Sequence, residues 1–407
     1  MKPAILFVDD DVNNLHSLKR LFYDLREEWS LFFAQSADEA LKILNHTDIQ
    51  TIVTDMRMPQ TDGAELLNIV RLKFPNIIRI ILSGYADQSM ITRTIASADQ
   101  FFSKPYDIKL LKKYLETVQS AVYNLRYENI FNLGPRTSPV YILPHVYKNI
   151  ISELSSTPAS LKNIFLLAEQ DPCLILKILN LVNSDFYGRR KSCTDHEQAV
   201  KDIGLEIFNE LFFKQSIFQP FPDSWSENDL ILETYKHAAL HGYIARELST
   251  QIFKSTPDSN TVFAITMLLY LSVIQLVLSN PKILNELKSN ASFMDSNFCL
   301  NEYFRNINHI YLNQISTYLC QFAGLPNVIS NTLRSFIYPK EIESETEQQK
   351  LLLKIIHFSG NLSDELLPYK KWNKIFNFSD IKFRPEEISQ SELNTICERI
   401  QTNIHRI

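Results

Sequence analysis

The sequence has few cysteines, and none of them is placed to build a site. Five cysteines are scattered over 407 residues, and no two of them form a CxxC pair; they are Cys173, Cys193, Cys299, Cys320 and Cys397. A disulfide framework needs an even set of cysteines, and a structural zinc site needs closely spaced thiols. The sequence therefore indicates neither, and it fits a reducing compartment such as the cytoplasm.

Long hydrophobic runs and an excess of positive charge are missing as well. The beginning MKPAILFVDDD reaches acidic residues after eight positions, which is unlike a signal peptide. The most apolar internal stretch, residues 268–278, is too short to cross a bilayer and predicts a buried helix. The formal net charge of −5 gives no basic surface for nucleic acid. We therefore expect a cytoplasmic protein with no membrane segment, and nucleic acid is not an expected partner.

The first 120 residues predict an α/β domain. Short apolar runs alternate with helix-length segments, and the interior runs are rich in Ile and Val, as in strands buried on both faces. Such a repeat implies a doubly wound parallel sheet, with a flavodoxin-like strand order 2-1-3-4-5. The expected strands are residues 4–8, 31–34, 51–54, 77–82 and 101–103, and the expected helices include 13–25, 37–44 and 64–73.

A long helix is predicted over residues 107–127, which contain no Gly or Pro. Its apolar residues are spaced by 3 and 4 from position 108 to position 125, which is heptad spacing. Two interpretations stay open. The helix packs on the sheet and then links the domains, or the 108–125 helix forms a homodimer.

The remaining sequence predicts a helical domain. After Gly134 and Pro135 there is almost no strand-like alternation up to about residue 336, and Asp171-Pro172 is a helix start, with Asp as the N-cap. We expect an α/β domain over 1–120, a helical linker over 121–134 and a helical domain over 135–340. Residues 341–407 form either a helical appendage or part of the same domain.

Chemically active residues stand where the predicted strands end, and they are Asp9, Asp10, Asp55, Ser83 and Lys104. Ligands bind at the carboxyl ends of parallel strands, so these side chains should converge. Neighbouring carboxylates repel each other unless a hard cation neutralises them, and oxygen ligands suit Mg²⁺. A hydroxyl and a lysine beside them would stabilise a phosphoryl group that is transferred to Asp55.

Residues 1–120 resemble the response-regulator receiver family, which is CheY-like. The motifs are ILFVDDD, VTDMRMPQTDG, ILSGY and FFSKPY, in that order. The resemblance implies that Asp55 is the phosphoacceptor and that a histidine kinase is the partner. It also implies that Mg²⁺ or Mn²⁺ is bound by Asp9, Asp10, Asp55 and the backbone carbonyl of Arg57.

The same resemblance assigns the remaining roles. Lys104 corresponds to the lysine that the family has at its phosphorylation site, and Ser83 corresponds to the switch hydroxyl. Phe102 occupies the place of the switch aromatic. The resemblance implies that Ser83 moves toward a bound phosphoryl group and that Phe102 repacks into the vacated space.

The helical half resembles the HDOD family, a catalytically disabled relative of HD-domain phosphohydrolases. The resemblance rests on LPHVYKNI, SLKNIFLLAEQDPCLILKILNLVNSDFYG and AVKDIGLEIFNEL. It implies a scaffold or regulator that binds another signalling protein, whose identity the sequence does not tell.

An HD-type enzyme would need a metal cluster built around a His-Asp pair. His237 and His241 are four residues apart on one predicted helix, which is a plausible half-site. In the neighbouring helix, however, Tyr270 and Leu271 stand where the His-Asp pair would be. We therefore interpret the two histidines as part of a half-exposed helix face and predict that the output domain is not an enzyme. The alternatives are a cyclic-dinucleotide phosphodiesterase controlled by the receiver and a transcription factor, for which no basic recognition helix is visible.

Overall fold

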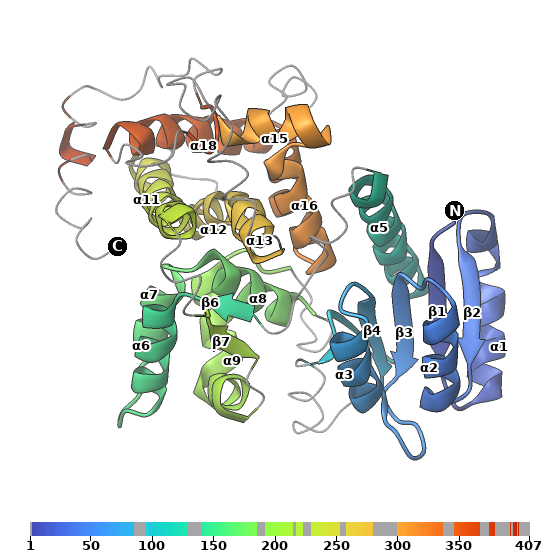
Figure 1. The fold of residues 1–407 in the computed structure, drawn as a ribbon. Helices are drawn as coiled ribbons and strands as arrows, with labels where there is room; N and C mark the ends of the chain where they lie inside the picture. The colour runs from blue at the N-terminus through green and yellow to red at the C-terminus, as the bar shows by residue number, and fades with distance from the viewer. Residues whose placement is uncertain are drawn as a thin grey trace.

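The computed structural model describes residues 2–84, 95, 97–127, 140–184, 192–214, 217–222, 229–252, 258–279, 299–336, 346–366, 374–378, 391, 394–396 and 398. An α/β part that ends with residue 127 lies beside a mostly helical part that begins at residue 140 (Figure 1). This arrangement confirms the predicted fold class.

A five-stranded parallel sheet forms the centre of the α/β part, in the order β2-β1-β3-β4-β5. All residues of β1, β3 and β4 are buried, because helices cover both faces of the sheet. The predicted strands and their order are thus confirmed to within one residue at each end. The strands are β1 (Ala4–Val8), β2 (Ser30–Ala34), β3 (Thr51–Asp55), β4 (Ile78–Ser83) and β5 (Gln100–Ser103).

The helices of the α/β part are α1 (Val12–Leu21), α2 (Ala37–His46), α3 (Gly63–Lys73) and α5 (Ile108–Tyr127). Alternate strand residues face opposite layers, so Phe7 belongs to the apolar cluster that contains residues of α1 and α5, and Leu6 belongs to the cluster of α2 and α3. The predicted helix 13–25 is shorter than expected. The backbone leaves the α-helical region at Phe22, and a 3-10 helix, η1 (Tyr23–Glu27), follows.

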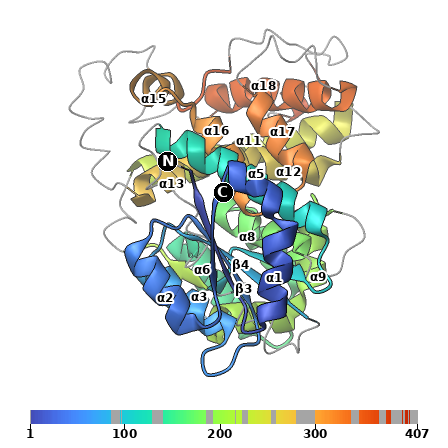
Figure 2. The same cartoon turned by 90° about the vertical axis from the view of Figure 1, so that its right-hand side faces the viewer.

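Helix α5 buries its heptad positions within the chain. Leu111, Leu115 and Val118 are fully buried, and α5 packs against α16 (Leu312–Phe322) of the helical part. Figure 2 shows α5 between the sheet and the helical part. The side chains at positions 122 and 125 lie outside the described residues. A homodimer through 108–125 remains a prediction, and the three buried positions would have to leave their present contacts to form it.

In the ranges described above, the helical part contains helices and one pair of very short strands. Parallel strands β6 (Val140–Ile142) and β7 (Phe218–Pro220) were not predicted, since three residues are too few to display alternation. The predicted N-cap is confirmed, because the Asp171 carboxylate accepts from the backbone N–H groups of Cys173 and Leu174. The helices are α6 (Pro144–Leu154), α7 (Leu161–Ala168), α8 (Pro172–Asn183), α9 (His196–Asn209), the π-helical η4 (Glu210–Lys214), α11 (Asp229–Ile252), α12 (Ser259–Leu269), α13 (Leu271–Ser279), α15 (Leu300–Asn308), α16, α17 (Asn327–Ser335) and α18 (Glu347–Leu366).

Helices α12 and α13 lie at the centre of this part. The segment Ser259–Leu278 is long and apolar enough to cross a membrane by length and composition alone, yet 94% of it is buried among the other helices. A core helix passes the same test of length and composition. The buried helix predicted at 268–278 is therefore confirmed as part of a longer buried segment.

The described part of the tail shares this core. Helix α18 packs along α11 and α17, and Ile375, Phe376 and Phe378 are fully buried. One continuous apolar cluster joins the α1 and α5 face of the sheet to the core of the helical part. The two parts are therefore packed together rather than merely linked.

Candidate phosphorylation site and histidine cluster

Asp9 and Asp55 meet at the carboxyl end of the sheet, as predicted from the strand ends. Both are buried, with 3% and 9% of their surfaces exposed. The Lys104 ammonium forms an ion pair with Asp55 and lies 3.3 Å from Oδ2 of Asp9. Burial alone would lower the Lys104 pKa, but the hydrogen bonds and charges of Asp55 and Asp9 outweigh it and raise that pKa. One cation thus holds two carboxylates close together.

Local hydrogen bonds orient the Asp9 carboxylate. The side-chain amide of Asn14 donates to Oδ1 at 3.1 Å and to Oδ2 at 3.2 Å, and the backbone N–H of Asp11 donates to Oδ1 at 2.9 Å. Asn14 is a site residue that sequence reasoning missed. The only feature of the sequence that could have pointed to Asn14 is its position in the first turns of the helix after strand one.

The loop after Asp55 also orients its side chain. The backbone N–H of Arg57 donates to Asp55 Oδ2 at 2.8 Å, and Gly63 N–H donates to Met56 O at 2.9 Å. A Cβ atom on Gly63 would lie 2.1 Å from the Asp55 carbonyl oxygen, so only glycine lets α3 begin this close to the strand end. The Arg57 peptide is therefore placed beside the carboxylate.

The predicted switch residues lie on neighbouring strands. Ser83 is buried at the end of β4, pairs with Ser103 of β5, and donates its hydroxyl hydrogen to Gly84 O at 2.8 Å. Phe102 is 3% exposed and contacts the Tyr114 ring edge-on at 5.8 Å. Phe102 is therefore connected to α5 as well as to the sheet.

The oxygen atoms at this end of the sheet suit a hard divalent cation. Asp9 and Asp55 supply buried carboxylates, and Asp10 follows β1 with an exposed side chain. All these donors are oxygen atoms, the type that Mg²⁺ and Mn²⁺ prefer. The chemistry of the donor set therefore fits the predicted ion.

His237 and His241, by contrast, do not lie on a half-exposed face. They are 1% and 0% exposed, so the interpretation as a half-exposed face was wrong. Helix α11 is covered by α12, the next helix in the chain, and by α18, which lies far from it in sequence. His241 Nε2 lies 2.8 Å from Ile356 O, and Nδ1 lies 3.0 Å from the Tyr270 hydroxyl. A carbonyl only accepts, so Nε2 carries the proton and Nδ1 accepts from Tyr270. Both ring nitrogens of His241 are therefore in use.

Aromatic rings surround this histidine. Tyr270 and Phe378 contact the His241 ring edge-on, at 5.9 and 5.0 Å, and Phe376 contacts Tyr270 in the same way. Tyr270 thus lies beside His241, where the alignment of the helices had placed it. Within the described ranges, no group of three or more His, Cys, Asp or Glu residues is arranged to hold a metal ion.

We expect the stability of the protein to fall in mild acid because of these histidines. Burial lowers the pKa of His237 and of His241 to about 3, whereas an unfolded chain has a His pKa of about 6.5. The unfolded state therefore binds more protons below pH 6.5. The stability due to the neutral imidazoles is fully present above that pH and is lost as the pH falls toward 3, by about 1.4 kcal/mol per pH unit for each histidine.

Urea unfolding of His241→Gln between pH 7 and pH 4 checks this expectation. The free energy of unfolding should depend less on pH than in the wild type, by up to about 1.4 kcal/mol per pH unit. His145→Gln, which changes an exposed histidine, is the control. Equal slopes for wild type and His241→Gln would contradict the prediction.

Two other features of the sequence have structural roles. His196 begins α9, is fully buried, and lies with Nε2 3.2 Å from the Glu169 carboxylate. Phe221 is a core residue stacked on Tyr141. The four described cysteines form no disulfide with one another.

Comparison with known proteins identifies both parts of the chain. The family model of the response regulator receiver domain matches residues 5–116, and that of the HDOD domain matches residues 140–321. Sporulation initiation phosphotransferase F of Bacillus subtilis is 32% identical over 120 residues, which are 28% of this chain and 95% of that protein.

Other relatives match a smaller share of their own length. The hydrogenase transcriptional regulatory protein HoxA of Cupriavidus necator is 35% identical over 123 residues, 30% of this chain and 24% of that protein. A cyclic di-GMP phosphodiesterase of Thermotoga maritima is 22% identical over 130 residues, 31% of this chain and 34% of that protein. The chain thus spans about a quarter of HoxA. The solved receiver domain of an HD domain-containing protein from Pseudomonas fluorescens Pf-5 is 30% identical, with a TM-score of 0.28. The match covers 30% of this chain and 99% of the solved domain.

The parallel sheet with its carboxylate and lysine site, together with these matches, defines the class: this chain is a two-component response regulator. Its particular architecture is a receiver domain followed by an HDOD domain.

Proposed function

We propose that a histidine kinase phosphorylates Asp55 and that this modification controls the HDOD domain. The observation that carries the proposal is the convergence of Asp9, Asp55 and Lys104 at the carboxyl end of the sheet. In the transfer, an oxygen of Asp55 attacks the phosphorus, the P–N bond to the kinase histidine breaks, and that imidazole takes up a proton. The product is an aspartyl phosphate.

The chain's own residues assist this step by position and charge. Lys104 already contacts the Asp55 carboxylate and would contact a phosphoryl oxygen, and Ser83 would donate its hydroxyl to another. Asp9, Asp10, Asp55 and the carbonyl of Arg57 would hold Mg²⁺ or Mn²⁺. When bound, this ion neutralises charge between the carboxylates and the phosphoryl oxygens. When Asp55 is phosphorylated, Ser83 would move toward the phosphoryl group and Phe102 would repack, which would alter the face formed by β5 and α5.

We further propose that the HDOD domain acts by binding another signalling protein and not by catalysis. The support is the state of His241, whose two ring nitrogens are engaged by Ile356 and Tyr270, so that neither is available to a metal. The competing proposal is a phosphodiesterase acting on a cyclic dinucleotide, which the name of the Thermotoga maritima relative favours. That enzyme class would need metal ligands in the helical domain.

Metal analysis of the purified full-length protein separates the two proposals. After dialysis, we expect no stoichiometric Fe, Mn or Zn, because His241 is already hydrogen-bonded on both sides. About one or two tightly bound Fe or Mn ions per chain would contradict the non-catalytic proposal. Asp55→Asn serves as the control, since it alters the receiver site and leaves the histidine cluster intact.

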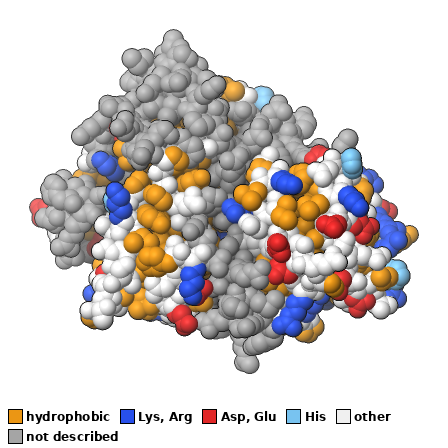
Figure 3. Space-filling model, turned by 60° about the horizontal axis from the view of Figure 1, so that its bottom comes forward, with side chains coloured by type: hydrophobic (Ala, Val, Ile, Leu, Met, Phe, Trp, Pro, Cys, Tyr) orange, Lys and Arg blue, Asp and Glu red, His pale blue; other side chains and the backbone are white. Residues whose placement is uncertain are grey.

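The remaining expectations concern partners and location. On the face shown in Figure 3, basic side chains are scattered among acidic and apolar ones, which supports a protein partner more than nucleic acid. The cysteine and charge composition supports a cytoplasmic location. A homodimer through the 108–125 helix stays a proposal, and light scattering of the full chain with and without beryllofluoride would test it.

A further inference from the structure

The end of helix α16 in the HDOD domain is completed by a residue of the receiver. The last carbonyls of a helix have no partner within the helix. Here Leu319, Cys320 and Gln321 accept from N–H groups of residues 323–325. Phe322 O instead accepts from the hydroxyl of Tyr114 on α5, at 2.7 Å. Tyr114 is 8% exposed, so this hydrogen bond is shielded from water.

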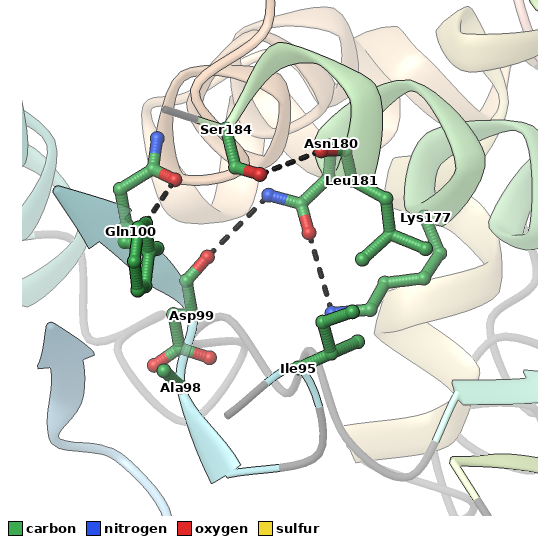
Figure 4. Close-up of a pocket in the computed structure, with 9 residues that line it drawn as sticks. Ile95, Ala98, Asp99, Gln100, Lys177, Asn180, Leu181 and Ser184 are labelled. Atoms are coloured by element: carbon green, nitrogen blue, oxygen red, sulfur yellow. Dashed lines mark hydrogen bonds between the residues drawn. The ribbon is translucent and has the colours of Figure 1, made fainter. Parts of the chain in front are cut away.

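A second contact lies beside the first. The side-chain amide of Asn180 on α8 donates to Ala323 O at 2.8 Å and reaches Asp99 O of the receiver at 3.4 Å, while its oxygen accepts from Lys177 at 3.2 Å (Figure 4). Asn180 and Lys177 are 5% and 4% exposed. One buried amide therefore joins the receiver, α8 and the end of α16.

The turn after α16 lies close to the receiver and contains a glycine. Gly324 has φ +65°, and a Cβ atom on it would lie 2.1 Å from Nε2 of Gln100. Glycine therefore permits both the left-handed backbone and the approach of Gln100. We call Asp99, Gln100, Tyr114, Asn180 and residues 322–324 the domain contact.

The domain contact is connected to the phosphorylation site through Phe102. This residue is paired with Leu82 in the sheet, next to the Ser83–Ser103 pair, and its ring contacts Tyr114. In the docked arrangement the Ser83 hydroxyl donates to Gly84 O, and Lys104 is paired with the Asp55 carboxylate. A phosphoryl group on Asp55 would compete for both groups, and the Ser83–Ser103 pair lies next to Phe102, whose ring contacts Tyr114.

We infer that the domain contact is a latch, held by the Tyr114 hydroxyl on Phe322 O and by Asn180, and that phosphorylation of Asp55 opens it. Opening would uncover the C-terminal half of α8 and the turn after α16. This inference rests on the proposed phosphorylation of Asp55, and it adds the route and the direction of the response.

Hydrogen exchange of the full-length protein, with and without beryllofluoride and Mg²⁺, tests the latch. In the wild type, beryllofluoride should speed the exchange of amides in residues 320–325. Tyr114→Phe keeps the ring and removes only the donor. It should raise this exchange about fivefold without beryllofluoride, the effect of losing one net hydrogen bond. Asn180→Ala removes the hydrogen bonds that α8 contributes to the domain contact. It should also speed the exchange of these amides without beryllofluoride.

Tyr147→Phe is the matched control, because it removes a half-buried hydroxyl from α6, away from the receiver (Figure 1). It should behave as the wild type does. A ¹⁹F NMR signal of the bound beryllofluoride reports whether Asp55 is occupied. If the adduct forms but exchange at 320–325 is unchanged or slower, or if both contact variants match the control, the latch is wrong and the phosphorylation proposal stands. If no adduct forms, the proposed function fails and the latch fails with it.

Discussion

Asp55→Asn is expected to abolish phosphorylation of the protein by acetyl phosphate or by a histidine kinase. The amide of Asn is a far weaker nucleophile than a carboxylate and cannot form the aspartyl phosphate. The substitution is nearly isosteric, and an amide oxygen can still accept from the backbone N–H of Arg57. We therefore expect a folded protein without the modification.

Phosphate-affinity electrophoresis and the intact mass, compared before and after incubation with acetyl phosphate and Mg²⁺, measure this effect. Asp38→Asn is the control, because this carboxylate in the first turn of α2 is exposed. It should be modified as fully as the wild type. Undiminished modification of Asp55→Asn would place the phosphoacceptor elsewhere.

Asp99→Ala is expected to cause a large loss of stability in the receiver. The Asp99 carboxylate lies 2.7 Å from the Arg79 guanidinium and accepts from the Arg79 backbone N–H at 2.8 Å, and both side chains are almost fully buried. Removing the carboxylate leaves a buried guanidinium without its counter-charge. Breaking such a pair costs about 3–5 kcal/mol.

Urea unfolding of the full-length chain, followed by circular dichroism and by hydrogen exchange in β4 and β5, measures this loss. Asp24→Ala is the matched control, since Asp24 also pairs with a basic residue, Lys112, at 3.3 Å, but its side chain is 82% exposed. An exposed pair contributes at most about 1 kcal/mol. Equal losses for the two variants would contradict the role given to the Asp99–Arg79 pair.

The receiver site was predictable because it depends on local order. In a parallel sheet the carboxyl ends of all strands lie at one edge, so Asp9, Asp55 and Lys104 could be placed together once the strands were recognised. The structure brings these three together as expected. Their roles in phosphoryl transfer and metal binding stay predictions. Asn14 was missed because an Asn near the start of a helix is ordinary in sequence, and only its distance to Asp9 gives it meaning.

The histidine pair marks the limit of this reasoning. Spacing of four residues places His237 and His241 on one face of a helix, but it does not tell what covers that face. The covering residues, Ile356 and Phe378, come from more than a hundred positions further along the chain. The same limit applies to β6 and β7, whose paired residues are 78 positions apart and which are too short to be seen in the sequence.

The sequence by itself determined the order of the elements, the parallel sheet and the residues at its carboxyl edge, because strand periodicity and helix spacing are local. It also led to the hypothesis that Tyr270 and Leu271 stand where an HD-type enzyme has its His-Asp pair. Only the tertiary structure decided that His241 is buried with both nitrogens engaged and that the Tyr114 hydroxyl completes helix α16. Those features are hydrogen bonds between residues 29 to 208 positions apart, and no local pattern encodes which distant carbonyl a buried donor will meet.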